Sequence, residues 1–149
     1  MSNLHDLYQE ILLEHNNKPR NFRKLDDANR QADGYNPLCG DQITLYLKVE
    51  DDVIADVSFQ GVGCAISRAS ASMLTQCVKG QTLNKAEEIF GGFHSLITEP
   101  DADVDYDLLG DLEMLSGVSA FPTRIKCAVL AWHTLNAAIE GTENSVTTE

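Results

Sequence analysis

The chain has 149 residues, of which 43% are hydrophobic and 23% are charged, so it is long enough for one globular domain and is neither disordered nor fibrous. Its 23 acidic against 11 basic residues give a net charge of −12, which repels phosphate backbones and argues against a nucleic-acid partner. The sequence shows neither an apolar run of 18 residues nor a basic leader followed by an apolar stretch. We therefore expect no membrane association, no signal peptide and a cytoplasmic location.

The first predicted element is a helix, because apolar residues recur at helical spacing over residues 4–12. This helix is expected to end near Asn16–Asn17, before Pro19. Its two histidines, His5 and His15, are interpreted as solvated positions. A polar linker separates the helix from the first predicted strand.

A small antiparallel sheet is expected next. Apolar and polar residues alternate strictly over residues 43–49, which predicts a half-buried strand. The pair Asp51–Asp52 forms a turn, and residues 53–59 are the returning strand. A third strand is expected over residues 32–35.

The second half of the chain is predicted to be helical. One helix is expected from Ala65 to the Lys79–Gly80 pair, and Thr82 can cap a second helix that breaks at Gly91–Gly92. The acidic segment 99–113 is interpreted as a surface excursion or a short helix.

The last predicted element is a long amphipathic helix from Pro122 to Glu140, with the proline in its first turn. Residues 141–149 are expected to form a disordered polar tail. These elements together predict one α+β domain over residues 1–140, in which a small antiparallel three-stranded sheet is packed with helices.

The four cysteines differ in their predicted positions. Cys77 shares a helical face with apolar residues and is interpreted as core packing, because a free cysteine is a small and commonly buried side chain. Cys39, Cys64 and Cys127 instead lie at the ends of predicted elements, where they can converge on one rim of the domain. In a cytoplasmic protein such thiols favour a metal-binding or catalytic role over a disulfide.

Asp41 and Arg124 can complete a site around these thiols. Residues 39 and 41 project to the same side of an extended backbone, and three sulfurs with one carboxylate suit a tetrahedral Zn²⁺. Arg124 precedes Cys127 by one helical turn and can stabilise an anionic sulfur. The alternative at Cys39 and Asp41 is an ordinary tight turn with a buried thiol. Spacing alone does not decide, because the chain has no Cys-x-x-Cys pair.

Three stretches of the sequence are GYNPLCGDQITLYLKVEDDVI, FQGVGCAISRASASML and FPTRIKCAVLAWHTL. They resemble the IscU-like family of iron–sulfur cluster assembly proteins, and in particular its SufU branch. The likeness extends over nearly the whole chain, and the combination of Cys-Gly-Asp, Gly-x-Gly-Cys-Ala and Arg-Ile-Lys-Cys is specific. The resemblance implies a SufE/IscU-like α+β fold and a metal site formed by Cys39, Asp41, Cys64 and Cys127.

Two features depart from the housekeeping IscU pattern. Lys126 stands where that pattern has a histidine before its last cysteine, and residues 121–126 replace a Leu-Pro-Pro-Val-Lys segment for chaperone docking. The longer stretch between Cys64 and Cys127, which contains the acidic segment 99–113, is similar to the SufU branch.

The resemblance implies a zinc-dependent sulfur carrier, or sulfurtransferase, that accepts persulfide sulfur from a PLP-dependent cysteine desulfurase. Its downstream partners would be an iron–sulfur assembly scaffold or apo-proteins. The family suggests Cys39 as the acceptor, Arg124 as support for the charge of the sulfur and Asp41 as an exchangeable ligand; the sequence alone does not choose Cys39 over Cys127.

Two alternatives stay open. The same residues can hold a [2Fe–2S] cluster on an assembly scaffold, because thiolates bind such clusters. A purely structural zinc site is the third interpretation, and Asp41 argues against it since closed structural sites usually consist of Cys and His alone.

Overall fold

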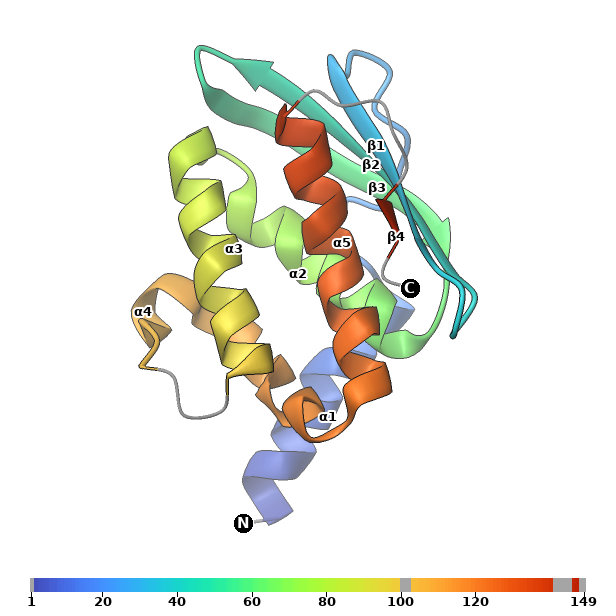
Figure 1. Cartoon of the computed structure of the whole chain (residues 1–149), viewed down its shortest axis with the longest axis vertical. Coiled ribbons are helices and arrows are strands. Elements are labelled where there is room, and N and C mark those ends of the chain that lie inside the picture. The colour runs from blue at the N-terminus through green and yellow to red at the C-terminus, as the bar shows by residue number, and fades with distance from the viewer. Residues whose placement is uncertain (1, 100–102, 141–145, 148–149) are drawn as a thin grey trace.

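The computed structural model describes residues 2–99, 103–140 and 146–147. Its strands form one sheet, and the helices that pack against the sheet lie on one side of it (Figure 1). This arrangement confirms the predicted α+β fold. In chain order the elements are α1 (Ser2–Asn17), β1 (Arg30–Asn36), β2 (Asp41–Glu50), β3 (Val53–Val62), α2 (Ala65–Val78), α3 (Leu83–Thr98), α4 (Tyr106–Leu109), the 3-10 helix η1 (Gly110–Ala120), α5 (Pro122–Glu140) and β4 (Val146–Thr147).

The antiparallel part of the sheet has β2 at its centre, with β1 on one side and β3 on the other. Asp51 and Asp52 both adopt positive φ angles in the turn between β2 and β3, as a tight hairpin turn requires. The three antiparallel strands confirm the predicted sheet. Each strand is longer than predicted from the sequence. Pairing continues to Asn36↔Asp41 at one end of β1 and to Gln42↔Val62 at one end of β3.

The predicted polar tail contributes a short strand. Val146 and Thr147 pair in parallel with Gly34 and Tyr35 of β1, a contact that the expectation of a disordered tail does not include. The other residues of that prediction, 141–145 and 148–149, lie outside the described residues.

The helix break predicted at Gly91–Gly92 is wrong, because α3 continues through both glycines to Thr98. The helix is held by burial on both sides of this pair, at Ile89 and Phe93. A Cβ at Gly92 would lie 3.1 Å from the Leu109 side chain. The second glycine therefore allows a close approach between α3 and the next segment rather than ending the helix.

Within the acidic segment 99–113, the described residues 103–113 form partly a helical surface and partly core. Asp105 caps α4 through hydrogen bonds to two backbone N–H groups, and the 3-10 helix follows directly. Leu109 and Leu112 in the same segment are fully buried. The aspartates at positions 103, 105, 107 and 111 are exposed, and the leucines of this stretch anchor it on α3.

Helix α5 is the central helix of the domain. It was expected to be amphipathic, but from Cys127 onward it is buried almost all round, since it lies against the sheet on one side and against α2 and α3 on the other. Gly34 permits the contact with β1, because a Cβ at this position would lie 2.1 Å from Thr134 Oγ1. In the part of the chain that the structure describes, no helix is both long enough and apolar enough to cross a bilayer.

The interpretation of His15 as a solvated residue is wrong. His15 is buried, and its Nδ1 lies 2.7 Å from Ser72 Oγ on α2. The backbone N–H of Arg20 also donates to Ser72 Oγ, so the hydroxyl hydrogen is available to the unprotonated Nδ1. Burial, together with the nearby Arg20 charge, lowers the pKa of His15. The pattern of α1 could not show this, because the partner of His15 lies 57 residues away.

His15 should make the stability of the protein depend on pH. Its folded-state pKa lies below the ordinary value of 6.5, so the unfolded chain binds the proton first as the pH falls. The contribution of neutral His15 to the free energy of unfolding is therefore complete above about pH 6.5, and it is lost as the pH decreases toward the folded-state pKa. We expect His15→Asn, which does not titrate, to reduce the loss of unfolding free energy between pH 7.5 and 5.5 in urea titrations. Equal losses in the two proteins would contradict this assignment.

Candidate metal centre

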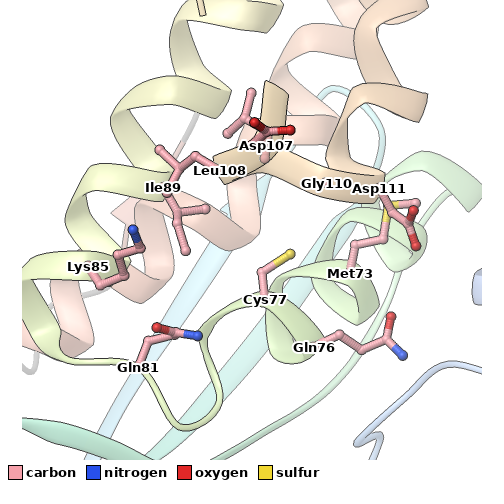
Figure 2. A pocket seen from close by; sticks show the side chains of 11 residues that line it. Met73, Gln76, Cys77, Gln81, Lys85, Ile89, Asp107, Leu108, Gly110 and Asp111 are labelled. Atoms are coloured by element: carbon pink, nitrogen blue, oxygen red, sulfur yellow. The ribbon is translucent and has the colours of Figure 1, made fainter. Parts of the chain in front are cut away.

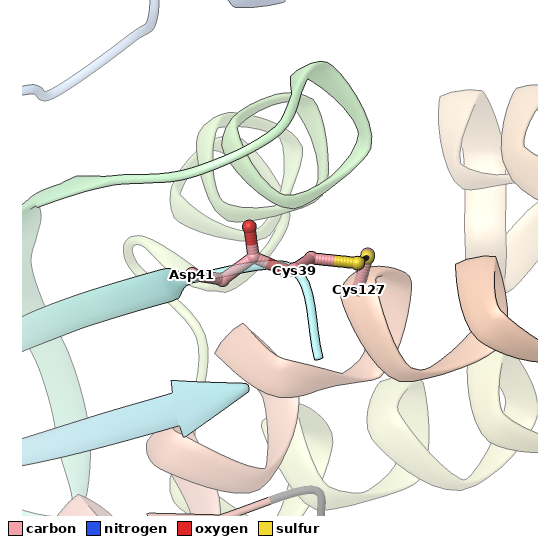
Figure 3. A group of neighbouring side chains, drawn as sticks. All are labelled: Cys39, Asp41 and Cys127. Carbon is pink, nitrogen blue, oxygen red and sulfur yellow. Dashed lines mark hydrogen bonds between the residues drawn. The ribbon is translucent and has the colours of Figure 1, made fainter. Parts of the chain in front are cut away.

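The candidate metal centre lies where the turn between β1 and β2 meets the second turn of α5 (Figure 3). Cys39, Asp41 and Cys127 each offer one ligand atom, and these atoms all lie within 4.8 Å of one another. Three of the four residues expected to form the site are thus brought together from segments far apart in the sequence.

The turn from Asn36 to Asp41 places two of these residues. Asn36 and Asp41 pair across the hairpin, and the N–H of Cys39 donates to the carbonyl of Asn36 at 3.3 Å. Gly40 has a φ of 71°, which a glycine adopts without steric cost. The turn leaves Cys39 exposed, whereas Asp41 at the start of β2 is only 2% exposed.

Cys64 reaches the site through the end of β3. Because Gln42 pairs with Val62, the segment after β3 runs beside Asp41, and the backbone N–H of Cys64 donates to Asp41 Oδ1 at 2.8 Å. The Cys64 sulfur caps α2 by accepting from the N–H of Ser67 at 3.5 Å. It is not one of the three most closely grouped ligands, but it interacts with the Cys127 thiol.

Cys127 is the fully buried member of the group. Its thiol donates to Cys39 Sγ at 3.3 Å and approaches the carbonyl of Thr123 at 3.6 Å. Burial raises the pKa of Cys127, and the neighbouring Cys39 and Cys64 thiols and the Asp41 carboxylate raise it further. These groups crowd acceptor atoms and negative charge into a small volume, which a divalent cation would stabilise.

The donor set fits zinc. Sulfur and carboxylate oxygen are both zinc ligands, and Cys39, Asp41 and Cys127 with Cys64 beside them supply the four atoms that a tetrahedral site needs. Thiolates also hold iron–sulfur clusters, so the chemistry of the donors alone accommodates either group.

Asn36 is a residue of this site that the sequence analysis missed. It is completely buried at the end of β1, and its Nδ2 donates to Asp41 Oδ2 at 3.0 Å and to Cys127 Sγ at 3.4 Å. The sequence could have indicated Asn36 through its position opposite Asp41 in a short hairpin. Paired residues of a hairpin project to the same face of the sheet, so their side chains share neighbours.

Arg124 lies one turn before Cys127 and is exposed. Among the described residues it forms no ion pair. Its side chain borders a cavity of about 430 Å³, which is also lined by Ala65, Ile66 and Phe121. Arg124 is therefore placed at the side of the site where α2 and α5 begin, and its expected role toward sulfur stays a prediction.

Cys77 lies apart from the other three thiols. It packs against the core from α2, in agreement with its interpretation, and Figure 2 shows its sulfur facing a cavity of about 340 Å³. Burial, with a smaller effect from the charge of Asp111, raises the pKa of Cys77 to about 11. This thiol is protonated at neutral pH and is a poor nucleophile.

The α+β domain thus brings three thiols and a buried carboxylate together, which is a donor set that can hold a metal ion. The chain belongs to the family of the NifU-like N terminal domain, whose model matches residues 7–128.

Relatives in this family carry two kinds of names. The chain is 42% identical to the zinc-dependent sulfurtransferase SufU of Bacillus subtilis over 93% of its own length and 92% of that protein. It is 41% identical to the iron–sulfur cluster assembly scaffold protein IscU of Thermotoga maritima over 90% and 93% of the two chains. A crystal structure from Fervidobacterium islandicum, described as a putative iron–sulfur cluster assembly scaffold protein for the SUF system, has a TM-score of 0.83 and 32% identity. The match covers 91% of this chain and 98% of that chain.

Gly63 should be required for the site because it leaves room for the carboxylate. A Cβ there would lie 2.4 Å from Asp41 Oδ1, so Gly63→Ala must displace Asp41 or the Cys64 N–H that holds it. We expect zinc affinity, measured by competition with a chromophoric chelator, to fall about 10- to 100-fold. Gly91→Ala is the matched control, since a Cβ there meets no atom within 4 Å. Equal affinities in the two variants would show that Asp41 does not need this space.

Proposed function

We propose that the protein is a zinc-dependent sulfur carrier that accepts persulfide sulfur from a PLP-dependent cysteine desulfurase for iron–sulfur cluster assembly. The observation that carries this proposal is that Cys39, the most accessible of the three site thiols, lies in a single ligand group with a buried thiol and a buried carboxylate. The similarity to a zinc-dependent sulfurtransferase over nearly the full length of both chains supports it. We place this function in the cytoplasm, where free thiols persist.

The proposed zinc ligands are Cys39, Asp41, Cys64 and Cys127. When bound, zinc would hold the thiols as thiolates and neutralise the charge that the three sulfurs and the carboxylate share. Asp41 is the harder ligand among softer sulfurs, and its two oxygens keep hydrogen bonds to Cys64 and Asn36. Asp41 is therefore the ligand whose release would cost the least free energy.

Cys39 is the proposed acceptor because it is the most accessible thiol of the group. Its thiolate attacks the terminal sulfur of the donor's cysteine persulfide. A new S–S bond forms on Cys39 while the S–S bond of the donor breaks, and the donor cysteine leaves as a thiolate, so the step involves no net oxidation. Cys127 does not suit this role, since it is completely buried.

Arg124 and the overall charge are proposed to assist docking. The exposed guanidinium, one turn before Cys127, can stabilise the anionic sulfur as the donor approaches. A net charge of −12 favours a basic surface on the desulfurase through electrostatic complementarity. Downstream, the sulfur would pass to an iron–sulfur assembly scaffold or to apo-proteins.

The second candidate is a scaffold on which a [2Fe–2S] cluster is assembled. The specific observation in its favour is that a relative 41% identical over most of both chains is named as an iron–sulfur cluster assembly scaffold protein. The donor thiols serve both functions, so metal content and effect on the desulfurase separate the two candidates.

The function is tested by isolating the protein under native conditions and adding it to a cysteine desulfurase. We expect about one zinc per chain, no visible chromophore, and faster release of alanine from cysteine by the desulfurase. A brown protein with bound iron and sulfide and no effect on alanine release would overturn the proposal in favour of the scaffold.

The assignment of Cys39 as the sulfur acceptor is tested by supplying the desulfurase with cysteine that is radiolabelled on its sulfur. Cys39→Ala should abolish transfer of label to this protein, whereas Cys77→Ala should retain it, because Cys77 lies apart from the site and its pKa is raised. Transfer of label to the Cys39→Ala protein would mean that another thiol receives the sulfur.

A further inference from the structure

Asn36 connects two of the proposed ligands without being one itself. Its side-chain amide donates one hydrogen to Asp41 Oδ2 and approaches Cys127 Sγ with the other. The orientation of the amide follows from its neighbours, because a carboxylate only accepts hydrogen bonds and must face the NH₂ end rather than the carbonyl end.

This orientation has a cost that the fold does not explain. The Oδ1 of Asn36 is buried and meets no donor among the described residues, and a buried acceptor without a partner lowers stability. Such exceptions need an explanation. Here the reason lies at the other end of the amide, which is directed at the site.

The carboxylate of Asp41 is consequently held from two directions. The Cys64 N–H occupies one lone pair of Oδ1 at 2.8 Å, and the Asn36 amide occupies one of Oδ2 at 3.0 Å. Each oxygen has a second lone pair, so either can bind a metal while both hydrogen bonds persist. If the carboxylate left a bound metal, it would remain a buried charge with two donors rather than an unpaired one.

We propose that Asn36 is a positioning residue, which orients Asp41 and Cys127 as ligands and keeps Asp41 hydrogen-bonded when that ligand is exchanged. The proposal rests on the proposed function in so far as exchange serves sulfur transfer. The orientation of the ligands can be measured with metal alone.

The test uses two variants of the full chain. Asn36→Ala removes the amide and leaves a cavity, and Asn36→Leu removes the same donors while filling most of the space. For both we expect zinc affinity to fall about 10- to 100-fold in chelator competition, as is usual when the partners of metal ligands are removed. The visible absorption of the cobalt-substituted variants should also shift relative to wild type, because the bands report the geometry of the ligands.

Ser70→Ala is the matched control. Ser70 is buried on α2 and its Oγ donates to the carbonyl of Ala128, next to Cys127, so its loss weakens the packing of α5 without touching a ligand. This variant should have a lower thermal midpoint, yet bind zinc within about threefold of wild type and keep the wild-type cobalt spectrum.

Each outcome is decisive. Wild-type affinity and cobalt spectra in both Asn36 variants would overturn the positioning role, even if the wild-type protein accepts sulfur. If zinc affinity fell in Asn36→Ala alone, the effect would come from the cavity, and the positioning role would also be overturned. Weaker binding in both variants, in a protein that accepts no sulfur from the desulfurase, would support the positioning role and reject the proposed function.

Discussion

The carboxylate of Asp41 is the point on which the site depends. It is almost completely buried, so the fold must supply hydrogen-bond donors for its charge. The donors come from the end of β1 and from the segment that enters α2. By satisfying one buried charge, the domain fixes the relative positions of a hairpin turn and a helix start, and with them the sulfurs of Cys39 and Cys64.

The third element of the site is fixed by packing rather than by charge. Helix α5 is buried between the sheet and the other helices, and the absence of a side chain at Gly34 lets it lie directly on β1. Cys127 is thereby held at the depth of the core, facing the hairpin turn. A site assembled in this way combines a buried thiol with an accessible one.

Much of this arrangement could be predicted from the sequence. The pattern of apolar and polar residues predicted β2 and the returning strand β3. The positions of three cysteines at the ends of predicted elements indicated that these cysteines would converge, as Cys39 and Cys127 do. The failures concern contacts between segments distant in the chain. Helix α3 continues through Gly91–Gly92 because its neighbours bury it, and His15 is buried because α2 provides Ser72. Local patterns contain neither fact.

Asn36 shows the same limit at the site. Its role depends on the exact register of the hairpin and on the depth of α5, neither of which periodicity specifies. The resemblance to a known family pointed to the residues with metal-binding chemistry, but not to the neutral amide between them.

The separation of the site residues along the chain has a further consequence for chain entropy. Asp41 and Cys64 are 23 residues apart, and Cys39 and Cys127 are 88 apart, so an ion bound by all four closes two long loops. Like a disulfide, such a cross-link restricts the unfolded chain more than the folded one. If Asp41 alone left the ion, the three sulfurs would still join the hairpin turn to the starts of α2 and α5. The site could therefore give up its carboxylate ligand while the longest helix of the core stayed tied to both neighbours.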